Sequence, residues 1–140
     1  MGTYQRVIDI ANGLIEAVKA RDGLRMQERV EMLECAYKAE FGGKIDCYHA
    51  LYAFMLMNVA SVRYFSFNNM FGQVHVRYEE MVPRMKGLRE DSNYTDEQKM
   101  EIEGLFKELE QIHKETPEKH RNLVVSRNDT RCCLCRVMPA

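Results

Sequence analysis

Residues 45–67 read IDCYHALYAFMLMNVASVRYFSF, and this stretch decides the predicted fold. Between Cys47 and Val62 almost every residue is apolar or small, whichever side of a helical wheel it occupies. A helix with one apolar stripe lies on a protein surface, whereas a helix that is apolar all round is enclosed by other elements. Polar residues such as Asn58 and Arg63 interrupt the stretch, and a membrane span needs about 20 mostly apolar residues. We therefore expect a central helix surrounded by other helices, and no transmembrane segment.

The segments before this stretch carry apolar residues at the three- and four-residue spacing of amphipathic helices. The first predicted helix runs from about Thr3, as its N-cap, to Arg21, and Gly23 is the expected left-handed residue that stops it. The second predicted helix ends at the pair Gly42-Gly43. Because the turn between these two helices is short, they are expected to pack as antiparallel neighbours.

The segment that follows the central helix allows two interpretations. Residues 62–78 alternate in a pattern rich in aromatic and β-branched side chains, which is compatible with a β-hairpin. Apolar residues from Met70 to Leu88 nevertheless keep helical spacing, with Asn68 or Asn69 as a cap. We prefer the helix, and we expect Pro83 to kink it because proline removes one backbone donor.

The fifth predicted helix has the clearest start signal. Thr95 and Gln98 have the spacing of a capping box, and two acidic residues lie between them where the helix dipole favours negative charge. The chain is thus predicted to be an all-α bundle of five helices around the central one. The helical domain spans residues 1–118, and residues 119–140 form either a short extra helix or a basic, cysteine-rich tail without fixed structure.

Composition limits the classes of partner. The chain has 140 residues and a formal net charge of −1, so no overall field attracts it to nucleic acid or to an anionic membrane. The N-terminus lacks an apolar core long enough for a secretory signal. Five cysteines are an odd number, and three of them crowd near the C-terminus, which is a poor disulfide framework. We therefore expect an intracellular, cytoplasmic protein.

The C-terminal tail suggests three alternative roles. From Lys119 onward it holds five basic residues against one acidic residue, Asp129, so it predicts weak nucleic-acid binding that does not depend on base sequence. Its thiols beside arginines also suit S-acylation, because stable anchoring needs a lipid and a second signal. A zinc site is the third alternative, although the cysteines lack the usual paired spacing. The residues concerned are Arg121, Arg127, Arg131 and Arg136 for nucleic acid, and His120, Cys132, Cys133 and Cys135 for the metal or, for the cysteines, lipid.

Catalytic motifs are absent from the sequence. Glu110 and His113 have the Glu-x-x-His spacing of carboxylate-bridged di-iron bundles, and Asp46 with His49 is an aspartate version. The order of helices places these two pairs at opposite ends of the bundle, so no di-iron site is expected. His75-Val-Arg-Tyr-Glu79 stands alone as a His-x-x-x-Glu motif.

Two cysteines outside the tail, Cys35 and Cys47, have apolar neighbours within helical patterns and are expected to be inert packing residues. We therefore expect a non-enzymatic protein without a cofactor.

The ten methionines give the leading functional hypothesis. Methionine is unbranched and polarizable, so it fills irregular cores and also lines adaptable binding grooves. The segment from 45 to 88 holds more apolar residues than one helix pair needs, which predicts a surface for a protein partner or for a second copy of the chain. The predicted partner-binding residues are Met55, Met70, Phe71, Tyr78, Met81 and Met85.

Overall fold

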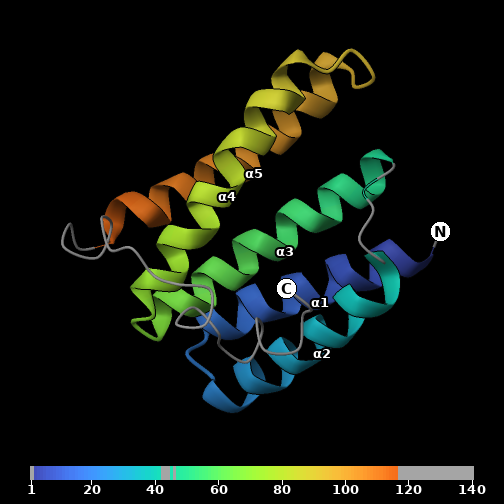
Figure 1. Cartoon of the computed structure of the whole chain (residues 1–140). Helices are drawn as coiled ribbons and strands as arrows, with labels where there is room; N and C mark the ends of the chain where they lie inside the picture. The colour runs from blue at the N-terminus through green and yellow to red at the C-terminus, as the bar shows by residue number, and fades with distance from the viewer. Residues whose placement is uncertain (1, 42–44, 46, 117–140) are drawn as a thin grey trace.

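The computed structural model describes residues 2–41, 45 and 47–116, and it confirms the all-α bundle (Figure 1). The five helices are α1 (Gly2–Lys19), α2 (Gly23–Phe41), α3 (Tyr48–Phe67), α4 (Phe71–Glu90) and α5 (Asp96–Glu115). Successive helices reverse direction, so that α1, α3 and α5 run one way along the bundle and α2 and α4 the other. The β-hairpin alternative for residues 62–78 is wrong, because these residues form the end of α3, a short turn and the start of α4.

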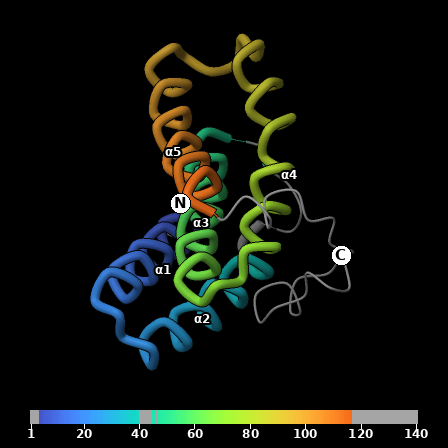
Figure 2. Tube along the Cα trace, turned by 90° about the vertical axis from the view of Figure 1, so that its left-hand side faces the viewer, coloured from blue at the N-terminus to red at the C-terminus, as the bar shows by residue number. Residues whose placement is uncertain are grey.

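Helix α3 is the central element, as its sequence predicts. Every residue from Ala53 to Val62 is buried, and α3 contacts each of the other four helices. Figures 1 and 2 show α3 between the α1–α2 pair and the α4–α5 pair. The helix starts at Tyr48 rather than at residue 45, because the Cys47 Sγ atom accepts a hydrogen bond from the Ala50 N–H at 3.4 Å and serves as the N-cap.

One face of α3 packs against α1. His49 contacts the ring of Tyr4 in α1, with ring centroids 5.6 Å apart. Ala53, Met57 and Ala60 follow His49 at helical spacing and therefore lie on the same side. All three are at most 1% exposed. We call these four residues of α3 the α1 face, and its two alanines allow close approach of the α1 backbone.

The opposite face of α3 packs against α4 and α5. It carries Leu51, Met55, Asn58 and Val62, which again follow helical spacing. Asn58 is fully buried and accepts a hydrogen bond from Arg77 of α4 at 3.4 Å, while its own amide donates to the Phe54 carbonyl at 2.8 Å. A buried amide needs partners of this kind, because an unpaired polar group costs about 1–3 kcal/mol. These four residues form the α4–α5 face.

Two turns of the bundle have the same left-handed geometry. Arg21 after α1 has φ 56°, and Asn69 after α3 has φ 60°. In each turn the N–H after the left-handed residue donates to the carbonyl five residues back: Asp22 to Ala17 at 3.0 Å, and Met70 to Phe65 at 2.8 Å. This is the Schellman pattern, which satisfies the last carbonyls of a helix.

The structure corrects three cap predictions, two of them at these turns. Arg21, not Gly23, is the left-handed residue, and Gly23 instead begins α2. The Asp22 carboxylate accepts a hydrogen bond from the Arg25 N–H at 3.1 Å and so caps the start of α2. Asn69 belongs to the turn that ends α3, and the N-cap of α4 is Met70, which provides no side-chain hydrogen bond. Thr3 lies inside α1 rather than before it.

The fifth helix starts as predicted. The Thr95 side chain accepts from the Gln98 N–H at 3.1 Å, and the Gln98 side chain accepts from the Thr95 N–H at 3.0 Å. The two helices of the α4–α5 pair are joined by Arg89, whose guanidinium donates to both carboxylate oxygens of Glu103. Pro83 lies on the exposed side of α4, which runs through it as one continuous helix. No helix within the described residues is long and apolar enough to cross a membrane.

Candidate functional site

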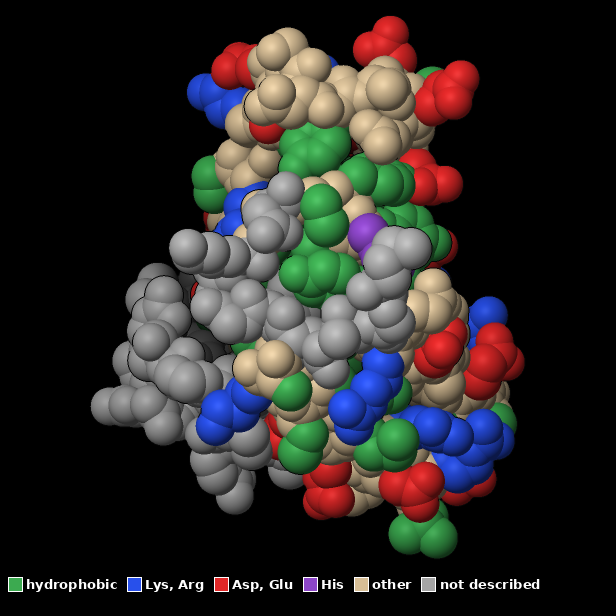
Figure 3. All heavy atoms as spheres, turned by 90° about the vertical axis from the view of Figure 1, so that its right-hand side faces the viewer, with side chains coloured by type: hydrophobic (Ala, Val, Ile, Leu, Met, Phe, Trp, Pro, Cys, Tyr) green, Lys and Arg blue, Asp and Glu red, His purple; other side chains and the backbone are tan. Residues whose placement is uncertain are grey.

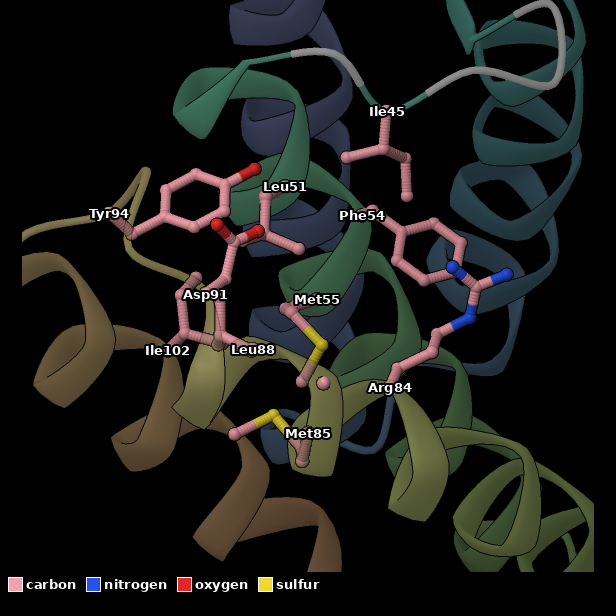
Figure 4. A pocket seen from close by; sticks show the side chains of 11 residues that line it. Ile45, Leu51, Phe54, Met55, Arg84, Met85, Leu88, Asp91, Tyr94 and Ile102 are labelled. Atoms are coloured by element: carbon pink, nitrogen blue, oxygen red, sulfur yellow. The ribbon is translucent and has the colours of Figure 1, made fainter.

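A pocket of about 370 Å³ lies between α3, α4 and α5 (Figure 4). Methionine side chains from two helices, Met55 of α3 and Met85 of α4, approach one another at its floor. A volume of this size lies within the range of about 300–1,000 Å³ that binding clefts occupy. We call this cavity the methionine pocket, and its apolar lining on the three helices consists of Leu51, Phe54, Met55, Met85, Leu88 and Ile102.

Charged groups stand on two opposite walls of the methionine pocket (Figure 4). The Arg84 guanidinium lies over the Phe54 ring, 5.0 Å from its centroid, which is a cation–π contact. On the other wall the Asp91 carboxylate accepts a hydrogen bond from the Asn93 N–H at 2.9 Å. Both residues belong to the C-terminal half of α4 and the turn after it. The pocket is therefore apolar inside and polar at two points of its rim.

A second, polar cavity adjoins the methionine pocket. The two cavities share Ile45, Asp91 and Tyr94, so they are neighbours at this end of the bundle. Cys47, Asn93 and Gln98 are among the other residues that line the polar cavity. Figure 3 shows hydrophobic side chains gathered in the middle of the face that it views, with charged side chains above and below them.

The predicted partner-binding residues are divided by the structure. Met55 and Met85 line the methionine pocket, although each is only 1% exposed. Met81 is equally buried, in the core. The remaining three are half-buried and lie outside the pocket: Met70, Phe71 and Tyr78. The spacing of apolar residues along one helix predicts which of them share a face of that helix. It does not predict a pocket, because the residues that line a pocket come from several helices.

The sequence did not single out most of the residues that line the pocket. Arg84, Leu88 and Asp91 follow one another at helical spacing along α4, and that signal is visible in the sequence. Ile45 and Ile102 come from distant parts of the chain, and only the packing of three helices brings them to the same cavity. No local pattern records that arrangement.

A cluster of polar rings and carboxylates lies between α4 and α5, outside the methionine pocket. His75 Nδ1 is 3.2 Å from His113 Nε2, and the Tyr78 ring stacks on the His113 ring with centroids 4.1 Å apart. Glu79 lies 3.7 Å from His75 Nε2, and the Tyr78 hydroxyl donates to Glu110 at 3.3 Å. The motifs Glu110-x-x-His113 and His75-x-x-x-Glu79 thus meet each other, which sequence spacing did not predict.

His75 and His113 are close enough for one hydrogen bond between their ring nitrogens. Their ring centroids are 5.4 Å apart, and the ring planes meet at 28°. Such a pair needs one N–H donor and one lone-pair acceptor. Among the described residues, no group of three or more His, Cys, Asp or Glu side chains is arranged to hold a metal ion. Asp46, the partner of His49 in the other motif, lies outside those residues.

The surroundings of the Tyr78 hydroxyl disfavour its ionisation. Burial, followed by the negative charge of Glu110 and its hydrogen bond and by the charge of Glu79, raises the pKa of Tyr78 above its ordinary value of 10.0. All of these effects disfavour the phenolate. Tyr78 therefore stays a neutral hydrogen-bond donor to Glu110 well into the alkaline range.

The expectation for the two non-tail cysteines is wrong. Cys35 and Cys47 are both exposed rather than buried among apolar neighbours. Cys35 follows Leu33 and Glu34 along α2, and those two residues take the buried positions of that turn. Cys47 is exposed because it precedes α3 as its cap. The proposed tail residues all lie outside the described residues: Arg121, Arg127, Arg131, Arg136, His120, Cys132, Cys133 and Cys135.

Arginines of the helical domain are mostly engaged within it. Arg63 pairs with Glu108 of α5 at 3.2 Å. Arg77 donates to Asn58 and lies over the Phe65 ring. They therefore join helices of the bundle.

Comparison of the chain with protein-family models, with curated proteins and with solved structures gives no match.

Proposed function

We propose that the chain is a non-enzymatic interaction protein that binds a helical segment of a partner protein, with an apolar side chain of that segment in the methionine pocket. The observation that supports this most strongly is the pocket itself, which is open, largely apolar and floored by Met55 and Met85. Methionine side chains adapt to different shapes at low cost and are frequent in surfaces that accept apolar anchors. Large apolar side chains that enter such pockets dominate the energy of protein interfaces.

The shape of α4 beside the pocket suits a helical partner. Gly87 lines the pocket, and a Cβ atom built at this position meets no atom within 4 Å. Because Gly87 has no side chain to project from the pocket wall, the backbone of a partner helix can approach α4 closely there. Arg84 and Leu88 lie one turn apart on the same side of α4. They provide the polar and apolar contacts that flank an inserted side chain.

A substitution at Gly87 provides the test. Gly87→Phe places a large ring at the pocket wall, where an added Cβ atom meets no atom within 4 Å, and Gly104→Phe makes the same change at an equally open position of α5 outside the pocket. Neither change should weaken folding, because glycine is the less favourable residue in both helices. Helical peptides selected from a random library against the wild-type protein are then measured for binding to all three proteins.

The proposal predicts that the selected peptides share a large apolar residue, that Gly87→Phe weakens binding at least tenfold and that Gly104→Phe leaves it unchanged. Equal binding to all three proteins, or failure to select any binder, would contradict it. Light scattering tests the other candidate occupant of the pocket, a second copy of the chain. A wild-type dimer that becomes monomeric in Gly87→Phe would show that a second copy, not a separate partner, fills the pocket.

A further inference from the structure

We infer that the partner segment is acidic next to its apolar anchor: it carries a carboxylate, one helical turn from the inserted side chain, that pairs with Arg84. This inference rests on the proposed function and specifies the chemistry of the partner. It depends on the position and the contacts of Arg84.

Among the described residues that line the methionine pocket, Arg84 is the only basic one. Its guanidinium lies at the pocket rim over the face of Phe54, 5.0 Å from the ring centroid. Within the described residues, no carboxylate forms an ion pair with Arg84, whereas Arg63 and Arg89 are paired with Glu108 and Glu103. The charge of Arg84 is therefore available to a ligand in the pocket.

The stacking on Phe54 also fixes where that charge is. A free arginine side chain loses rotamer entropy when it is immobilised, and a guanidinium already held on a ring loses less. The five donors of a guanidinium match the two oxygens of a carboxylate. Preorganised contacts of this kind favour recognition because binding restricts fewer side-chain rotations.

The negative charge of Asp91 on the opposite wall favours Arg84 as the residue that binds an anionic partner group. The Asp91 carboxylate already accepts the Asn93 N–H and, as a negative group, repels an anion at its own end. An anionic partner residue is consequently directed to the Arg84 side. None of the described residues that line the polar cavity beyond Asp91 is basic, which strengthens the same preference.

The pair formed with Arg84 is expected at the edge of the interface, where it remains near water. Exposed ion pairs contribute about 0.2–1 kcal/mol, which corresponds to at most about fivefold in affinity. The apolar anchor therefore supplies most of the affinity and the carboxylate supplies selectivity.

A double-mutant cycle tests the inference. The probes are two designed amphipathic helical peptides with the same phenylalanine anchor, one with Glu and one with Gln a turn away from it. The proteins are the wild type, Arg84→Glu and Lys86→Glu. Lys86 lies two residues further along α4, is exposed and does not line the pocket, so its replacement makes the same change in net charge at a neighbouring position.

The expected result is that the Glu peptide binds the wild type about three- to fivefold more tightly than the Gln peptide. This preference should disappear or reverse in Arg84→Glu and persist in Lys86→Glu. Raising the salt concentration should reduce it, because exposed pairs are screened.

Two results separate failure of the inference from failure of the proposed function. If both peptides bind the wild type equally and Gly87→Phe abolishes both, the pocket binds the anchor but the acidic partner is wrong. If Gly87→Phe changes neither affinity, or neither peptide binds, both ideas fail. Displacement of the Glu peptide by submillimolar dodecanoate would assign the pocket to small amphipathic carboxylates and would also overturn the inference.

Discussion

The two sides of α3 are packed with different kinds of side chain. On the α1 face, alanines alternate with Met57, and α1 forms the most extensive helix contact that α3 makes. On the α4–α5 face, longer and more polar side chains such as Met55 and Asn58 meet methionine and arginine from α4. Small side chains bring helices close and fill space evenly, whereas long, flexible or charged ones leave gaps between them. Both described cavities lie on the α4–α5 side.

This contrast suggests that the two sides of the bundle have different roles. The α1–α2 side holds α3 in place through close packing, and the α4–α5 side presents the methionine pocket. The following predictions test the contrast, beginning with the largest expected effect.

Truncation of a core leucine should be costly on the α1 side and milder at the pocket. Leu14 is fully buried in α1, so Leu14→Ala should lower the free energy of unfolding by about 2–5 kcal/mol. Leu51 is half-buried at the pocket, so Leu51→Ala should cost less than about 2 kcal/mol because its surroundings already include open space. Urea unfolding measures both values, and equal losses would contradict the contrast.

Ala53 on the α1 face and Met85 at the pocket floor should respond differently to replacement by leucine. Ala53→Leu adds volume to the α1 face, where the residue is fully buried, and should destabilise the protein by about 1–3 kcal/mol. Met85→Leu conserves volume at the pocket floor and should cost less than about 1.5 kcal/mol. Thermal unfolding followed by circular dichroism compares the two variants. A freely tolerated Ala53→Leu would mean that α1 does not approach α3 closely.

Glycine substitutions in the two left-handed turns should each raise the free energy of unfolding by a smaller amount. Arg21→Gly removes a Cβ clash at φ 56° and should stabilise the protein by about 0.5–1 kcal/mol, since arginine rarely adopts this conformation. Asn69→Gly at φ 60° should gain less, because asparagine tolerates the left-handed region. The shift in urea midpoint gives both numbers. Loss of stability in Arg21→Gly would contradict the Schellman geometry of the first turn.

The smallest effect concerns alkaline pH. Because the native pKa of Tyr78 is above 10.0, the folded protein retains the phenolic proton at a pH where the unfolded chain releases it. The resulting stabilisation is complete below pH 10 and is lost as pH rises through the native pKa. The wild type should therefore lose stability above pH 10 more steeply than Tyr78→Phe, with urea midpoints as the measure. Parallel curves would show that Tyr78 does not titrate differently in the two states.

Much of the fold could be predicted because the relevant signals are local. The five helices follow from apolar spacing, the central position of α3 from its uniform apolarity, and the Thr95–Gln98 capping box from two residues three positions apart. The turn geometry was less accessible, because Gly23 is the residue type expected in the left-handed region, whereas Arg21, which adopts it, carries no such sequence signal.

The site depends on contacts between distant segments. His75 and His113 are 38 positions apart, and their contact depends on the register of α4 against α5. Ile45, Arg84 and Ile102 reach the methionine pocket from three different parts of the chain. Sequence spacing identified the methionines as candidate binding residues, but it could not show which of them face a cavity and which, like Met81, face the core.

The most direct test of the account is to follow the methionine methyl groups by NMR while the Glu-bearing helical peptide is added to ¹³C-methyl-labelled protein. Met55 and Met85 line the pocket, whereas Met57 lies on the α1 face and Met26 is buried in α2, so the latter two serve as internal references. The account predicts that the Met55 and Met85 signals shift with peptide concentration while those of Met57 and Met26 do not. Shifts of equal size at all four methyl groups, or shifts confined to Met57 and Met26, would contradict it.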